Sequence, residues 1–288
     1  MAELEPIDLH HQGAERVIGS YLLDTDDGPA VFDPGPSTTV GALKAGLAER
    51  GLELGDVRHL LLSHIHLDHG GAAGTLVREQ PGLQVHVSEI GAPHLVDPAR
   101  LERSARRLYG DTFDTLWGEL APVPRENVHI ADGRVLGLEC FPTPGHASHH
   151  VCYLDRDGTL YAGDAAGVRI QPGRLVLPPT PPPEADVEVW QRTIDEIELR
   201  TPERLALVHF GVAEDPVRHL AELRLALYDW AEFVQGGATE EEFIAYGRTE
   251  LADAGEDVRA YDVAMPLWQS YLGLKRWAER QADLPPAA

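Results

Sequence analysis

The sequence predicts a mixed α/β fold with a helical C-terminal extension. Short apolar runs typical of buried strands alternate with segments of helical periodicity between about residues 4 and 211. Residues from about 212 to 281 carry helical patterns alone. The proline-rich stretch 178–183 is interpreted as a stiff loop, because strand and helix signals resume after it. We therefore predict one domain over residues 1–288, with a helical insertion at about 89–122.

Charge and composition limit the class of partner. The chain has 288 residues and a formal charge of −23, from 24 basic and 47 acidic side chains. Such a charge repels phosphate backbones and anionic lipid surfaces, so no nucleic acid or membrane partner is expected. No signal peptide or membrane span is recognised, and a cytoplasmic location is expected. The two cysteines, Cys140 and Cys152, are expected to be buried free thiols.

The first half of the core is predicted to alternate strands with helices. The turn at Pro34-Gly35-Pro36 ends one apolar run, and Ser37 or Thr38 is a candidate N-cap for the helix that follows. The strands are predicted at 4–10, 17–23, 29–33, 60–62 and 84–88. One helix is predicted at about 39–50, and another is predicted to start in the glycine-rich segment 70–74 and to end at about residue 80.

The insertion at 89–122 is predicted to form one or two helices. It serves either as a lid over the site or as packing on the sheet. Tyr109, Phe113 and Trp117 recur at i, i+4 and i+8, which is typical of a packed face. After the insertion, strands are predicted at 136–141, 151–154, 159–162 and 204–208, with a helix at about 184–200.

Residues 58–70 contain a dense group of metal-capable side chains. An apolar run is followed within six positions by His64, His66, Asp68 and His69. Side chains alternate in an extended segment, so His64 and His66 point the same way. A solvated histidine-rich loop is the alternative, but the buried strand in front and the aspartate within favour a metal site.

Three further predicted strands each end at one side chain of ligand type: His146, Asp164 and His209. A single histidine at a strand end is usually structural, so each signal is weak alone. Together with the first group, four strand ends offer five histidines and two aspartates. That set is sufficient for two metal sites that share one carboxylate.

The order of these motifs resembles the metallo-β-lactamase-fold hydrolase superfamily. The motifs are HIHLDH, TPGH, GDA and VHFG, and the similarity extends from about residue 17 to 211. Within the superfamily they are nearer to glyoxalase II and related thioester or lactone hydrolases than to true β-lactamases. The resemblance implies a four-layer αββα sandwich with the metals at one edge of the sheets.

The resemblance also assigns the ligands. One divalent metal would take His64, His66 and His146, the other would take Asp68, His69 and His209, and Asp164 would bridge them. Asp33 matches the family's early carboxylate, which orients a metal-binding loop, and its alternative is a simple turn residue. His150 is expected to hold its loop by a hydrogen bond, while His149 replaces a glycine of the family pattern and is expected in the pocket or at the surface.

The implied activity is that of a metal-dependent hydrolase. Two cations would generate a hydroxide near neutral pH and polarise the carbonyl of an ester, thioester or lactone, with Asp68 holding or relaying a proton. Zinc is the default metal, and iron or manganese fits the same ligands. A mononuclear-iron oxidoreductase of the persulfide dioxygenase type is the alternative, followed by a non-catalytic metal-binding protein.

The substrate is expected to be a small molecule, and its identity stays open. Lys275 and Arg276 form a basic pair in the last predicted helix, which is too little to indicate a glutathione thioester. The C-terminal helices are expected either to shape the pocket or to form a homodimer interface.

Overall fold

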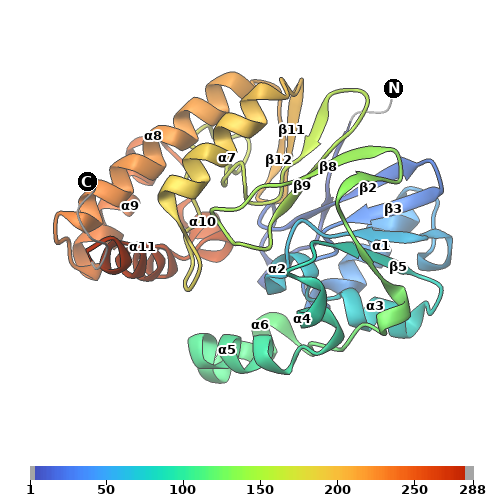
Figure 1. Ribbon diagram of the computed structural model, residues 1–288. Helices are drawn as coiled ribbons and strands as arrows, with labels where there is room; N and C mark the ends of the chain where they lie inside the picture. The colour runs from blue at the N-terminus through green and yellow to red at the C-terminus, as the bar shows by residue number, and fades with distance from the viewer. Residues whose placement is uncertain (1–3, 283–288) are drawn as a thin grey trace.

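The computed structural model describes residues 4–282, and within that range two mixed six-stranded sheets pack face to face (Figure 1). The first sheet has the order β1 (Ile7–Asp8), β2 (Gly19–Thr25), β3 (Gly28–Phe32), β4 (His59–Leu61), β5 (Gln84–Val87), β6 (Val128–Ile130). The second has the order β12 (Gly211–Ala213), β11 (Arg204–Leu207), β10 (Thr159–Tyr161), β9 (Val151–Leu154), β8 (Leu138–Pro142), β7 (Gly133–Val135).

The centre of the first sheet is parallel because helices connect its strands. Strand β3 leads through α1 (Val40–Glu49) to β4, and β4 leads through α2 (Leu67–Gly70) and α3 (Ala73–Glu79) to β5. Val31, Leu60 and Val85 stand side by side in this register, and each is at most 1% exposed. Apolar residues at these positions explain why the sequence pattern identified the central strands.

Aromatic side chains fill the space between the two sheets. The Phe32 ring meets Tyr153 edge-on at a centroid distance of 6.0 Å and Tyr161 at 5.5 Å. The Tyr21 hydroxyl lies 2.8 Å from the carbonyl oxygens of both Leu207 and Gly211, so this buried phenol has a polar partner in the opposite sheet. The two sheets therefore share one core.

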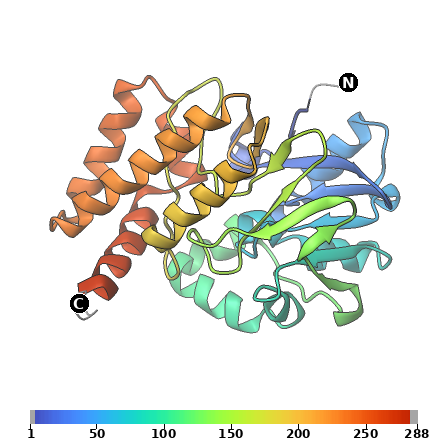
Figure 2. The ribbon, with the colours of Figure 1, turned by 45° about the horizontal axis from the view of Figure 1, so that its top comes forward.

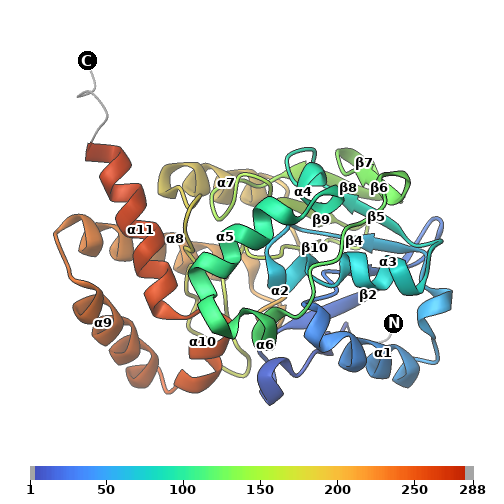
Figure 3. The ribbon, with the colours of Figure 1, turned by 90° about the horizontal axis from the view of Figure 1, so that it is seen from below.

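Helices cover the outer faces and complete the predicted αββα arrangement. In Figures 1 and 3, α1 and α3 lie on the side of the first sheet, and α7 (Val187–Leu199) lies on the side of the second. The insertion forms three short helices where one or two were predicted: α4 (Ala92–Val96), α5 (Ala99–Tyr109) and α6 (Phe113–Trp117). The four-layer fold class is confirmed.

Some local predictions were wrong or incomplete. Ser37 and Thr38 do not cap α1; their hydroxyls donate to the carbonyls of Trp117 and Leu116 and so attach α6 to the core. Three strands were not predicted: β6, β7 and β12. Each has three residues and lies at or next to a sheet edge, which is too short for a recognisable alternation.

The C-terminal helices pack beside the second sheet (Figure 2). They are α8 (Pro216–Gln235), α9 (Glu240–Asp253), α10 (Val258–Ala264) and α11 (Leu267–Ala282). Trp230 of α8 is fully buried and meets Phe243 of α9 at 4.9 Å. Within residues 4–282, no helix is both long and apolar enough to cross a membrane. The single-domain division and the homodimer alternative stay predictions.

His219 in α8 leads to a prediction about pH. Burial lowers its pKa to about 4, while its Nε2 donates to the Ala166 carbonyl at 2.7 Å. Between pH 6.5 and 4 the unfolded chain therefore binds more protons at this site than the folded chain. Stability should fall by about 3 kcal/mol as the pH drops through that window. Urea unfolding curves at pH 6.5, 5.5 and 4.5 measure this loss of stability, and the variant His219→Gln should lose less stability over the same range. The same pH dependence of stability in the variant and the wild type would contradict the prediction.

Candidate metal centre

The predicted ligands lie where several strands end at one edge of the sandwich. Asp33 follows β3, Ser63 and His64 follow β4, Asp164 follows β10, and His209 follows β11. In each sheet, these strands run parallel to one another, so their carboxyl ends lie at the same edge. The structure thus brings together residues from distant parts of the sequence.

One half of the centre consists of three imidazoles. The Nε2 atoms of His64 and His146 each lie 2.9 Å from Nδ1 of His66. His64 and His146 are buried, whereas His66 is half-buried. The three ring nitrogens form a compact group of the size that holds one metal ion.

The other half combines two imidazoles with two carboxylates. Nε2 of His69 lies 3.8 Å from Oδ2 of Asp68 and 3.3 Å from Oδ1 of Asp164. Nε2 of His209 lies 3.5 Å from Oδ2 of Asp68 and 3.6 Å from Oδ1 of Asp164. The second carboxylate oxygen of Asp164 lies 3.3 Å from Nε2 of His146, so Asp164 stands between the two halves.

Hydrogen bonds on the far side of the ring orient four of the five imidazoles, those of His64, His69, His146 and His209. His146 Nδ1 donates to the Pro179 carbonyl at 2.7 Å, and His209 Nδ1 donates to the Val17 carbonyl at 2.6 Å. Because a carbonyl can only accept, the proton of each neutral ring sits on Nδ1 and leaves a lone pair on Nε2. Such outer contacts orient metal-binding histidines.

Asp33 and Ser63 do the same for the rings of His69 and His64. The Asp33 carboxylate accepts from Ser63 N–H at 2.7 Å, from Ser63 Oγ at 2.6 Å and from His69 Nδ1 at 2.8 Å. Since Ser63 Oγ donates to Asp33, it accepts from His64 Nδ1 at 2.9 Å. Asp33 is completely buried, so this network holds both rings from behind.

The chemistry of the donor set fits a pair of metal ions. The lone pairs of His64 and His146 both face His66 Nδ1, and the single proton that a neutral ring can carry there satisfies only one of them. Buried Nε2 of His69 and Oδ1 of Asp164 likewise lack a hydrogen-bond partner within residues 4–282. Two ligand atoms of a tetrahedral zinc ion stand about 3.4 Å apart. The ring nitrogens and carboxylate oxygens of this centre are separated by 2.9–3.8 Å, a range that includes this value.

The electrostatics of the two halves differ in a way that suits cations. Burial is the main cause that lowers the pKa of His64, His66 and His146, so these rings remain neutral and each keeps a nitrogen lone pair that can bind a metal ion. Burial also acts to lower the pKa of His69, but the carboxylates of Asp164, Asp68 and Asp33 outweigh it and raise that pKa well above its ordinary value. One half therefore offers lone pairs, and the other attracts positive charge.

The two histidines after the TPGH motif take different positions. His150 Nδ1 lies 2.7 Å from Thr143 Oγ1, and its Nε2 accepts from the Asp164 N–H at 3.1 Å, so it holds the loop that carries Asp164. His149 is only 6% exposed and lines the pocket beside the centre. Its ring centroid is 5.4 Å from that of His66.

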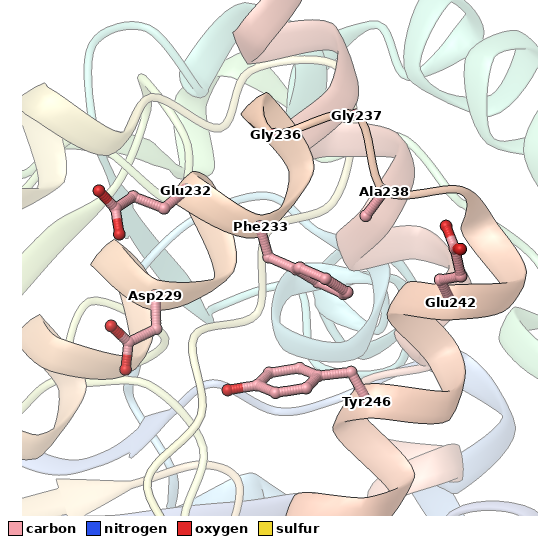
Figure 4. A pocket seen from close by; sticks show the side chains of 8 residues that line it. All are labelled: Asp229, Glu232, Phe233, Gly236, Gly237, Ala238, Glu242 and Tyr246. Atoms are coloured by element: carbon pink, nitrogen blue, oxygen red, sulfur yellow. The ribbon is translucent and has the colours of Figure 1, made fainter.

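A pocket of about 600 Å³ opens onto the centre and is lined by four of the predicted ligands, His66, Asp68, His146 and Asp164. A larger cleft of about 710 Å³ lies at the turn between α8 and α9, where Phe233 and Tyr246 face each other (Figure 4). No metal-ligand group within residues 4–282 adjoins that cleft. The pocket with convergent polar groups is therefore the candidate active site.

A family model described as the metallo-beta-lactamase superfamily matches residues 15–209. The chain belongs to this superfamily. The matched residues include all seven predicted ligands, which the structure gathers in three overlapping groups: His64, His66 and His146; His64, His69 and Asp164; Asp68, His69 and His209. Their roles as ligands stay predictions.

Curated superfamily relatives are similar over about half of this chain. The uncharacterized protein YobT of Bacillus subtilis is 29% identical over 53% of this chain and 63% of its own length. A hydroxyacylglutathione hydrolase of Salmonella paratyphi A is 30% identical over 50% and 45%, respectively, and the thioesterase pkgB of Emericella nidulans is 27% identical over 54% and 38%. The chain thus spans less than two thirds of the length of these relatives.

Solved superfamily structures share the fold more completely. The family protein TTHA1429 from Thermus thermophilus has a TM-score of 0.70 at 22% identity, covering 99% of this chain and 95% of that chain. TTHA1623, solved in a di-iron-bound form, has a TM-score of 0.56 at 25% identity, covering 75% and 95%. The likeness to TTHA1429 includes the C-terminal helical region.

The superfamily motifs did not reveal everything that surrounds the centre. The carbonyls of Val17 and Pro179, which orient two ligand histidines, carry no sequence signal because every residue has a carbonyl. Ser63 does carry one: it is a small polar residue at a strand end, directly before the first ligand. It links Asp33 to His64.

Asp33 leads to a prediction about metal affinity. In the variant Asp33→Asn, an amide N–H₂ group replaces one of the two carboxylate oxygens that accept hydrogen bonds from Ser63 N–H, Ser63 Oγ and His69 Nδ1. Asparagine tolerates the positive φ of 48° at this position, so the backbone should be retained. Metal affinity should fall by about 10- to 100-fold, measured by competition with a chelator of known affinity. The exposed Asp24→Asn variant should bind as wild type, and equal affinity in Asp33→Asn would refute the orienting role.

Proposed function

We propose that this chain is a dinuclear metal-dependent hydrolase that cleaves an ester, thioester or lactone of a small molecule. His64, His66 and His146 would hold one divalent metal, Asp68, His69 and His209 the other, with Asp164 between them. Zinc is the metal that these ligands favour, with iron or manganese as alternatives.

The position of Asp164 is the observation that carries this proposal. Its two oxygens lie within 3.3 Å of a histidine in each half, so one buried carboxylate faces both ligand groups. The names of two relatives, a thioesterase and a hydroxyacylglutathione hydrolase, support a thioester substrate, and the di-iron form of TTHA1623 supports two metals.

The metals would lower the pKa of a bound water and polarise the substrate carbonyl, which is the chemistry that such a pair supplies. The protein's own groups do the rest. Asp68 is the one carboxylate of the second half with a partly exposed side chain, at 21%, and it lines the pocket. The carboxylate oxygen of Asp68 that does not face His69 and His209 would hold the proton released at the reacting centre and pass it to the leaving group. His66 and His146 also line the pocket and would help to position the carbonyl.

The experiment combines metal analysis with a substrate panel. Protein purified without chelator is analysed by mass spectrometry for metal content, then assayed with thioesters, lactones and a β-lactam. Two metals per chain and hydrolysis of a thioester or lactone are expected. One iron per chain with oxygen uptake would replace the proposal with the oxidoreductase alternative.

A matched pair of variants links the activity to the centre. His66→Ala should abolish hydrolysis, whereas His129→Ala makes the same change at an exposed position on β6 and should leave the rate as it was. Hydrolysis that survives in His66→Ala would show that the centre does not perform the reaction. Absence of any hydrolysis in the metal-loaded wild type, across the panel, would favour a non-catalytic metal-binding protein.

A further inference from the structure

The pocket above the centre has one wall that comes from the helical insertion. One face of α5 lines it, together with part of α11. The Tyr109 hydroxyl at the end of α5 lies 3.4 Å from Oε1 of Gln269 in α11, and Figure 3 shows the ribbons of the two helices near each other. The α5 face recurs at helical spacing and consists of Arg100, Leu101, Ser104, Ala105, Arg107 and Leu108.

Three arginines in this pocket carry charges that the protein does not neutralise. Arg100 and Arg107 of α5 and Arg276 of α11 are exposed, line the pocket, and form no ion pair within residues 4–282. Arg106, on the other face of α5, is paired with both Glu102 and Asp114. In a chain with 47 acidic and 24 basic residues, unpaired arginines at one pocket call for an explanation.

The carboxylates of the pocket do not cancel this charge. Asp68 and Asp164 face the histidines of the centre and belong to the proposed metal ligands. Glu184 accepts hydrogen bonds from both the backbone N–H and the hydroxyl of Ser148, and within residues 4–282 it forms no ion pair with an arginine. The arginine side of the pocket is left with surplus positive charge.

We propose that this pocket selects acyl substrates that carry an anionic group, a carboxylate or a phosphate, which Arg100, Arg107 and Arg276 bind while the acyl carbonyl sits at the metal centre. The inference rests on the proposed hydrolase function and assigns its substrate class. A guanidinium presents a planar fork of donors that matches both kinds of anion.

The apolar residues that line the same pocket indicate a further property of the substrate. The pocket is also lined by apolar side chains, including Ile65 and Leu67 next to the ligand His66 in the chain and Leu101 and Leu108 on the arginine-bearing face of α5, and Ile90 contributes an apolar surface that is 54% exposed. Apolar walls with a few polar groups are typical of small-molecule sites. The selected substrate is therefore amphipathic, with an apolar segment as well as the anionic group.

The test uses pairs of thioesters that differ only in charge. S-hexanoyl-3-mercaptopropionate is compared with its uncharged propionamide, and S-hexanoyl pantetheine 4′-phosphate is compared with S-hexanoyl pantetheine. The metal-loaded protein should show a kcat/KM about tenfold higher for the charged member of at least one pair, and salt should reduce the difference. The pair that shows the preference distinguishes a carboxylate from a phosphate.

Variants connect the preference to the arginines. In the triple variant Arg100→Gln, Arg107→Gln, Arg276→Gln the charged-to-neutral ratio of kcat/KM should fall about tenfold, through KM. Arg103→Gln removes the same charge from α5 outside the pocket and should keep the ratio. Equal rates for both members of each pair, or a preference that survives in the triple variant, would overturn the inference while the hydrolase function stands.

Binding gives a second measurement that does not depend on turnover. The thioether analogues of the four thioesters cannot be hydrolysed, and calorimetry reports their affinity for metal-loaded protein. A charged thioether should bind about tenfold more tightly than its neutral partner in the wild type, but not in the triple variant. If no compound of the thioester, lactone and β-lactam panel is hydrolysed, the proposed function fails, and the calorimetry still decides whether the arginines bind anions.

Discussion

Replacing Asp164 by asparagine should lower kcat/KM by about a thousandfold or more and reduce the metal content from two per chain towards one. The Asp164 side chain lies within 3.3 Å of His69 in one half and of His146 in the other, and the residue is only 3% exposed. Asparagine keeps the shape but loses the charge and turns one donor oxygen into an N–H₂ group. A metal contribution of several kcal/mol corresponds to at least this loss of rate.

Kinetics with a thioester substrate and metal analysis by mass spectrometry check this together. The control is Asp26→Asn, which makes the same change at an exposed position in the turn between β2 and β3 and should keep both metals and the full rate. A circular dichroism spectrum confirms that both variants are folded. Two metals and an unchanged rate in Asp164→Asn would mean that this carboxylate does not join the two halves.

The sequence predicted those strands whose own residues form a recognisable pattern of buried side chains. Strands β3, β4 and β5 are central, and their apolar runs are bounded by turn residues, so they were identified. In β6 and in β7 two of the three residues are exposed, so neither strand shows a period. Their place in the sheets follows from tertiary pairing, which no local pattern encodes.

The insertion shows another limit of sequence patterns. Tyr109, Phe113 and Trp117 have the spacing of one helical face, yet α5 ends at Tyr109 and α6 begins at Phe113. Gly110, with a φ of +55°, follows the last residue of α5. The packing prediction still applied to Phe113, which is completely buried beside Leu67. The aromatic spacing predicted burial here but not the continuity of the helix.

The candidate metal centre was predictable because its proposed ligands follow strands in recognisable motifs. The arginines that we propose to select the substrate are different, since Arg100 and Arg276 are 176 positions apart and each resembles an ordinary exposed arginine. Their common pocket appears only when α5 and α11 are brought together. Residue type at a fixed spacing therefore predicts the reacting centre, whereas substrate selection depends on how separate helices pack.

Removing the metals should lower the thermal unfolding temperature by at least about 10 °C. Without cations, the lone pairs of His64 and His146 face His66 Nδ1 at 2.9 Å, and the carboxylates of Asp164 and Asp68 lie close together. Each metal present at 1,000 times its dissociation constant stabilises the folded state by about 4 kcal/mol. Two such metals, at about 2 °C per kcal/mol for a chain of this size, give the expected shift.

Calorimetry on chelated and on zinc-reloaded protein measures this shift, and reloading should restore the original temperature. His66→Ala should retain roughly half of the zinc-dependent shift, because it removes a ligand from one half only, while His129→Ala should retain all of it. The same unfolding temperature with and without chelator would show that the buried imidazoles and carboxylates are stable without a cation. In that case the hydrogen bonds from Asp33 and from the Val17 and Pro179 carbonyls would be sufficient to hold the centre.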